Sequence, residues 1–171
     1  MNEKRLDASV HQSSVLDIEK VVRILHQEWL VRGKLQLSAF ALQPGETYIS
    51  VNRPSVDSFE SDVRSFLTQH MGYKDKEDRY SRAVLGVDDI RSIKVDIDGS
   101  PLAVDVEVEP RAKHTKSHAG IFTRYEGKNV KTGQTIKVSE QLRGVSSDDI
   151  LLDVRLSLLD IASVESCNLT E

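Results

Sequence analysis

The sequence predicts a single α+β domain, in which a mainly antiparallel sheet built from hairpins is covered by about three helices. Three observations predict this fold class. Apolar residues recur at helical spacing over residues 14–33, 57–72 and 146–164. Turn signals lie between runs of alternating apolar and polar character at 35–51 and 93–108. The length of 171 residues suits one domain with a core of its own.

The first predicted helix covers residues 14–33. Its apolar stripe advances by three or four residues at each step, which places the stripe on one face of a helix. The members of the stripe are Val15, Ile18, Val22, Leu25 and Trp29. Ser14 has the side chain of an N-cap, and Asp17 follows three residues later. Gly33 stands where a residue in the left-handed conformation would end the helix.

The first predicted hairpin turns at Pro44-Gly45. Proline presets φ at the second position of a β-turn, and glycine accepts a positive φ at the third. Leucine and alanine occupy alternate positions over 35–41, and residues 48–51 supply the returning strand. Pro54 ends that strand, because proline has no N–H for a ladder.

The second predicted hairpin turns at Asp98-Gly99, which is a strong short hairpin signal. Branched aliphatic residues occupy alternate positions over 93–97 and 102–108. One face is therefore aliphatic and the other acidic, as in a half-buried antiparallel sheet. The acidic face has two interpretations, a divalent-metal site and a solvated surface, and the strict alternation favours the second. Its members are Asp96, Asp98, Asp105, Glu107 and Glu109.

The remaining segments complete the predicted sheet and its helices. A second helix begins at Asp57 and ends at Gly72. The charged stretch 72–82 is expected to be an exposed loop. Two further strands are expected at 119–122 and 134–138.

The chain is divided into a polar tail at 1–13, the domain at 14–164 and a C-terminal tail at 165–171. The first residues lack the apolar centre of a signal peptide, and no run approaches the ~20 apolar residues that span a bilayer. We therefore expect a cytoplasmic protein without membrane contact. The single cysteine, Cys167, excludes a disulfide framework within the chain and a zinc site built from cysteines.

The charge is distributed unevenly along the chain. The formal net charge is −4, yet residues 111–143 contain eight Lys or Arg and two Glu, which gives that segment +6 and the remainder −10. Such asymmetry is consistent with an anionic partner, including nucleic acid, for the basic segment. The alternative is that the basic segment neutralises the acidic remainder within the fold.

The most suggestive polar residues lie between 111 and 118. With one arginine that precedes the second helix, they form the predicted anion-binding set: Arg53, Arg111, Lys113, His114, Lys116 and His118. On a helix, the spacing of His114 and His118 would allow both imidazoles to bind one metal ion, whereas in a strand they lie about 13 Å apart. The neighbouring cations repel a divalent ion, so we expect no metal site. An exposed basic loop is the alternative interpretation.

The predicted C-terminal helix is apolar on two sides. The main stripe includes Ile150, Val154 and Leu158, and a second side carries Leu152, Leu156 and Leu159. A helix of this kind is deeply buried or contacts a partner. The second side therefore predicts an interface with another copy of the chain or with another protein.

Function is predicted mainly by exclusion. The sequence has no GxGxxG after a strand, no P-loop, no HExxH, no GxSxG and no CxxC, so no enzyme class is identified and no cofactor is expected. The first hypothesis is a non-enzymatic binding or assembly module that acts through its C-terminal helix. The alternative is a phosphate- or nucleic-acid-binding protein that uses residues 111–143. A further alternative is a metal-assisted hydrolase that uses His114, His118 and the acidic strands.

Overall fold

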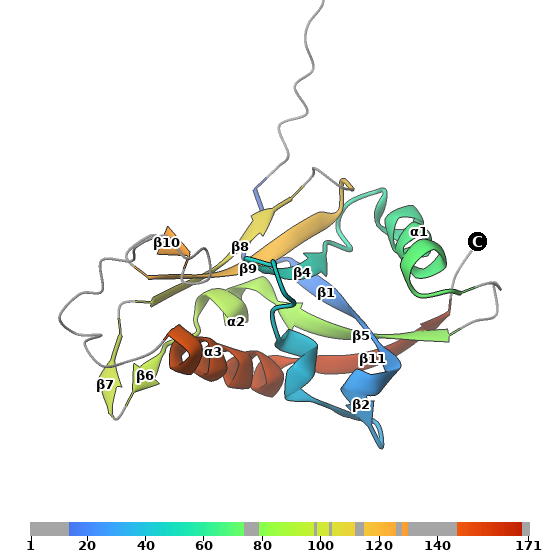
Figure 1. Cartoon of the computed structure of the whole chain (residues 1–171). Coiled ribbons are helices and arrows are strands. Elements are labelled where there is room, and N and C mark those ends of the chain that lie inside the picture. The colour runs from blue at the N-terminus through green and yellow to red at the C-terminus, as the bar shows by residue number, and fades with distance from the viewer. Residues whose placement is uncertain are drawn as a thin grey trace, which may run out of the picture.

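A mainly antiparallel sheet with three α-helices forms the part of the chain that the structure describes, which confirms the predicted α+β class (Figure 1). The computed structural model describes residues 14–73, 79–97, 99–102, 104–111, 115–125, 128–129 and 147–168. No helix among these residues is long and apolar enough to cross a membrane. The expected tail at 1–13 and the expected strand at 134–138 lie outside the described residues.

The main sheet has the order β8-β9-β4-β1-β5-β11, and every neighbouring pair is antiparallel. Its strands are β1 (Lys20–Leu25), β4 (Ile49–Asn52), β5 (Arg79–Gly86), β8 (Val104–Pro110), β9 (His118–Tyr125) and β11 (Ser163–Asn168). The short β10 (Lys128–Asn129) pairs with the end of β9. Two small hairpins stand apart from this sheet, β2–β3 (Leu30–Val31 with Lys34–Leu35) and β6–β7 (Asp96–Ile97 with Ser100–Pro101).

Helices cover both sides of the sheet (Figure 1). On one side α1 (Phe59–His70) packs its buried residues Phe59, Val63 and Leu67 against Val22 and Ile24 of β1. On the other side α2 (Val87–Arg91) and α3 (Ser147–Ile161) close the larger part of the core. The helix predicted from Asp57 to Gly72 is therefore confirmed as α1.

The predicted helix at 14–33 is wrong, because residues 20–25 form the central strand β1. Val21 and Leu25 face the α2 and α3 side, whereas Val22 and Ile24 face α1, so both sides of β1 are buried. A strand buried on both sides is a continuous apolar run, and its residues match helical spacing by coincidence. The short 3-10 helix η1 (Gln27–Trp29) and the β2–β3 hairpin follow, and Gly33 lies in that turn at φ +76°.

The predicted hairpin at 35–51 is also wrong, although its turn is correct. Gly45 has φ +83°, as the turn at Pro44-Gly45 requires. The segment before it forms the 3-10 helix η2 (Leu37–Phe40), in which both Ala39 and Phe40 are buried. The returning strand β4 pairs with β1 and β9 instead of pairing with residues 35–41.

The hairpin at 93–108 is confirmed only near its turn, where β6 and β7 pair and Gly99 has φ +80°. The strand β8 pairs with β9, because residues 118–125 contain the expected strand at 119–122 and supply a longer partner.

Two segments that were expected to be irregular belong to the sheet. Residues 79–82 begin β5, although 72–82 was expected to be a loop, and Tyr80 is buried beneath α1. Residues 165–168 lie in β11 and pair with β5, so this part of the expected C-terminal tail is ordered. The side chains of β11 are mostly exposed, so its sequence lacks the alternation that marks a strand.

Candidate functional site

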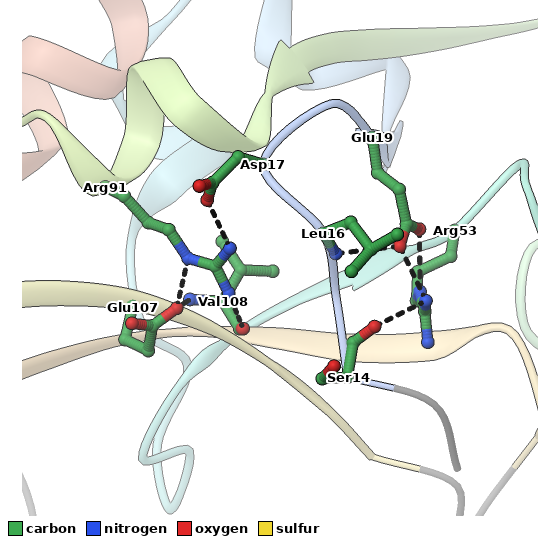
Figure 2. A network of polar contacts seen from close by, with 8 residues as sticks. All are labelled: Ser14, Leu16, Asp17, Glu19, Arg53, Arg91, Glu107 and Val108. Carbon is green, nitrogen blue, oxygen red and sulfur yellow. Dashed lines mark hydrogen bonds and ion pairs between the residues drawn. The ribbon is translucent and has the colours of Figure 1, made fainter.

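Arg53, a predicted anion contact, forms a buried ion pair with Glu19 (Figure 2). The Arg53 Nη2 lies 2.8 Å from Glu19 Oε1, and Nε donates to Oε2 at 3.0 Å. Only 4% of the Arg53 side chain and 7% of the Glu19 side chain are exposed. Burial disfavours the Glu19 carboxylate, but hydrogen bonds from Arg53, Ser55 and the Leu16 N–H outweigh that effect and lower its pKa to about 2. The charge of Arg53 is thus matched within the protein.

Arginine side chains form ion pairs with acidic residues of β8. Arg91 donates to Glu107, to Asp17 at 2.6 Å and to the Val108 carbonyl at 3.1 Å (Figure 2). Arg124 forms an ion pair with Glu109, and these hydrogen bonds hold the pKa of Glu109 below its usual range. Among the described residues, no group of three potential metal ligands gathers on this face or elsewhere.

The other predicted anion contacts are spread over the β8–β9 end of the sheet. The Arg111 guanidinium lies 4.8 Å from the ring centroid of Tyr48 and 4.9 Å from that of Phe122, so it stacks on two rings. Lys116 is exposed in the turn before β9. Lys113 and His114 lie outside the described residues, and so does most of 111–143 beyond residue 129. His118 lines a pocket.

This pocket lies between α1 and the place where β1 meets β4, and it has a volume of about 380 Å³. We call it the α1 pocket. The strands β1, β4 and β9 supply residues to its wall, α1 supplies others along its length, and Thr115 comes from the segment before β9. Its main polar side chains are Arg23, Asn52, Asp62, Gln69, His70 and His118.

The α1 pocket exists because β1 and β4 separate. They are paired only at Val22 and Asn52, whereas β1 and β5 share six paired positions. The Arg23 guanidinium bridges the resulting gap. Its Nε donates to the Ala39 carbonyl at 2.6 Å and its Nη1 to the Ser50 carbonyl at 2.7 Å. The side chain thus replaces ladder bonds with β4 and also joins β1 to η2.

Arg23 is a buried cation with no carboxylate within hydrogen-bond distance among the described residues. Only 6% of the residue is exposed. Burial lowers its pKa to about 10, against a favourable influence of Glu46, so the guanidinium remains charged at neutral pH. The guanidinium carbon lies 4.9 Å from the centroid of the Trp29 ring. A guanidinium has five N–H donors, and main-chain carbonyls accept two of those of Arg23.

Asp62 is a carboxylate in the wall of the α1 pocket. Asp62 Oδ2 accepts hydrogen bonds from the Ser58 hydroxyl at 2.8 Å and from the Ser117 N–H at 3.0 Å. These bonds fix Asp62 toward the start of α1, so it connects this helix to the turn before β9. Asp62 therefore has a structural role that is independent of Arg23.

A neighbouring hollow of about 540 Å³ also has His70 in its wall, together with His26 and Arg79. The side chain of His70 therefore lies between two concave surfaces that both carry basic residues.

Comparison with known proteins gives no relative. No family model, no curated protein and no solved structure matches this chain. Function is therefore inferred from the geometry of the molecule.

Among the residues that line the α1 pocket, the predicted anion-binding set includes His118 but neither Arg23 nor His70. The signal for Arg23 was present, because an arginine interrupts the apolar run Val21-Val22-Arg23-Ile24-Leu25. A charged residue on a buried strand needs a structural or functional partner. The helical interpretation of 14–33 concealed this signal, since a polar residue is ordinary on the outer face of a helix.

The predicted interface on α3 is only partly exposed. Leu152 and Leu156 are 42% and 48% exposed and lie one turn apart. Leu159 packs against the core together with Leu151. The second apolar side of α3 therefore contributes two leucines to the surface and the rest to the interior.

Proposed function

We propose that this protein binds a small phosphate-bearing ligand in the α1 pocket. The observation that carries this proposal is Arg23, a residue of the pocket wall whose buried guanidinium has only main-chain carbonyls as hydrogen-bond partners. A phosphate has several acceptor oxygens and a negative charge, so it matches the remaining donors of a guanidinium.

The other side chains of the pocket suit the same ligand. His70 and His118 can donate from imidazole nitrogens, and Gln69 and Asn52 can donate from amide nitrogens. The volume of about 380 Å³ lies within the range of small-molecule sites. It is too small for a nucleic-acid duplex, which favours a small ligand over the predicted nucleic-acid partner.

The balance of charge explains why binding would be favourable. A buried cation without a counter-charge loses its hydration and gains little in return. An anion that enters the pocket supplies the missing counter-charge at a site of low dielectric constant, where the attraction is strong. A ligand that binds the folded state alone also raises the unfolding temperature.

The test is calorimetric titration of the full chain with inorganic pyrophosphate and with inorganic phosphate. We expect pyrophosphate to bind, and we expect Arg23→Met and His70→Ala to weaken its affinity by about tenfold or more, the effect of losing one charge-assisted hydrogen bond. Arg64→Ala is the matched control, because Arg64 is a basic residue of α1 outside the pocket wall. It is expected to leave the affinity unchanged.

Several results would overturn the proposal. One is no binding of either anion to the wild type at about 10 mM, a concentration that detects even millimolar affinity. Another is equal affinity of the wild type and His70→Ala, which would place the anion elsewhere. If Arg23→Met does not fold, as judged by circular dichroism, His70→Ala and Gln69→Ala decide the question. A labelled ten-residue oligothymidylate that binds more tightly than pyrophosphate, with a steep salt dependence, would instead favour the nucleic-acid hypothesis.

The assembly hypothesis is the second candidate, and the exposed pair Leu152 and Leu156 favours it. Two leucines one turn apart form a small apolar patch, whereas a stable interface buries about 800 Å² on each partner. Self-association through α3 is therefore expected to be weak.

A further inference from the structure

A second cavity lies on the opposite side of the sheet from α1, between α3 and the strands β4 and β9. Its volume is about 170 Å³. We call it the α3 cavity. Apolar side chains form about half of its wall and include Phe40, Leu42, Ile49, Ile121, Leu151 and Val154. Four of these six residues are fully buried members of the main core, so the cavity is a hollow in a well-packed region.

One basic residue, Arg155, also lines the α3 cavity. Arg155 lies on α3 directly after the buried Val154, and its Nε is inaccessible to solvent and has no hydrogen-bond acceptor among the described residues. Its Nη2 reaches the Leu37 carbonyl only at 3.5 Å, the upper limit for a hydrogen bond. The Arg155 guanidinium thus makes a single long hydrogen bond among the described residues, which is uncommon for a side chain with a buried nitrogen and leaves its terminal nitrogens able to bind an anion.

We propose that the α3 cavity binds a small apolar carboxylate about the size of benzoate. The carboxylate accepts hydrogen bonds from the terminal guanidinium nitrogens of Arg155, because Nε is inaccessible to solvent and therefore to a ligand oxygen. The apolar body lies among Ile49, Ile121 and Val154. An engineered cavity of about 150 Å³ holds one benzene molecule, so about 170 Å³ accommodates a six-membered ring or a short branched chain.

The polar residues of the wall are compatible with this ligand. Thr47 and Thr123 have hydroxyls that can donate to a carboxylate. Asp148 also lines the cavity and would repel an anion, but its side chain is exposed, so solvent and salt screen its charge. The inference is independent of the α1 pocket, because the two hollows share no residue and lie against different helices.

The test is calorimetric titration of the full chain with benzoate and with benzamide, a neutral molecule of nearly the same shape. We expect benzoate to bind at least tenfold more tightly than benzamide to the wild type. Arg155→Met keeps the length of the side chain and removes its charge, and it is expected to weaken benzoate at least tenfold. Arg64→Met on α1 is the matched control and is expected to change nothing.

The outcomes separate this inference from the proposal for the α1 pocket. No benzoate binding to the wild type, or equal binding of benzoate and benzamide, overturns it. So does competition between pyrophosphate and benzoate, since that would place benzoate in the α1 pocket. The inference is supported if His70→Ala leaves the affinity for benzoate unchanged and Arg155→Met lowers it. If Arg155→Met fails to fold, the comparison of the two ligands on the wild type decides.

Discussion

The ion pair between Arg53 and Glu19 shows how one residue can connect three strands. Glu19 precedes β1, Arg53 follows β4, and the Arg53 N–H donates to the Ser117 carbonyl just before β9 at 2.8 Å. Ser55 adds a hydroxyl donor to the same carboxylate at 2.6 Å. Removing one partner of a buried pair leaves the other charge without compensation, which costs more than the intact pair contributes.

We expect Glu19→Gln to lower the free energy of unfolding by about 1–3 kcal/mol at pH 7, the cost of losing hydrogen bonds between charged groups. Urea unfolding followed by circular dichroism measures this loss. Glu165→Gln is the matched control. Glu165 pairs with Arg82 on the surface, where its side chain is 49% exposed, so its loss should cost less than about 1 kcal/mol.

The difference in stability between wild type and Glu19→Gln should depend on pH. The pKa of Glu19 is lowered from 4.5 to about 2 in the folded protein, so its contribution is fully present above about pH 4.5. As the pH falls from 4.5 toward 2, the unfolded state takes up a proton before the folded state does, and the contribution is lost. A difference that stays constant between pH 6 and pH 3 would contradict the assigned pairing.

At the scale of elements, the sequence predicts those whose two faces differ. The amphipathic α1 and the alternating β8 have one buried face each, and their patterns predict them correctly. The strand β1 is buried on both faces and β11 is exposed along most of its length, so neither carries the alternating pattern of a half-buried strand. The α1 pocket could not be predicted for the same reason. An arginine at position 23 is ordinary on the outer face of a helix and becomes unusual only when residues 20–25 are known to form a central strand.

Gly120 of β9 lies between β4 and β8, where a side chain would clash with two neighbouring aromatic rings. A Cβ placed there would lie 2.5 Å from Tyr48 Cδ2 and 2.9 Å from Phe122 Cε2. We expect Gly120→Ala to displace these rings and to lower the free energy of unfolding by about 1–3 kcal/mol. Chemical unfolding measures the loss, and near-ultraviolet circular dichroism reports on the rings. In a Tyr48→Ala background the cost should shrink, because the first clash is gone, and an unchanged cost would contradict this explanation.

Across the whole molecule, the structure shows where some basic residues of the positively charged segment 111–143 lie. Arg111 stacks on Tyr48, just before β4, and on Phe122 of β9, whereas Arg124 stacks on Phe122 and pairs with Glu109. These two members of the basic segment lie against the acidic face of β8, which agrees with mutual neutralisation. The rest of the +6 segment lies mainly outside the described residues, so a partner for it stays a prediction.

Self-association through α3 also belongs to this scale. We expect the protein to be monomeric at micromolar concentration and to associate only weakly at higher concentration, because Leu152 and Leu156 alone remain exposed on the predicted interface. Sedimentation equilibrium over a dilution series measures this. Replacing both leucines by Gln should abolish any association, and a dimer that persists in that variant would place the interface elsewhere. Leu16→Gln is the control, since Leu16 is equally exposed but lies outside α3.

The pairing of β11 with β5 has a consequence for the order in which the molecule is built. Arg82 and Glu165, which meet across these strands, are 83 residues apart in the chain. During synthesis β5 can pair with β1 as soon as it emerges, but its other edge stays open until β11, which follows α3, has emerged as well. An open edge invites pairing with other chains, and distant contacts form slowly. The growing chain therefore spends much of its translation with one side of its central strands unprotected, and we expect its yield to depend on chaperones at that stage.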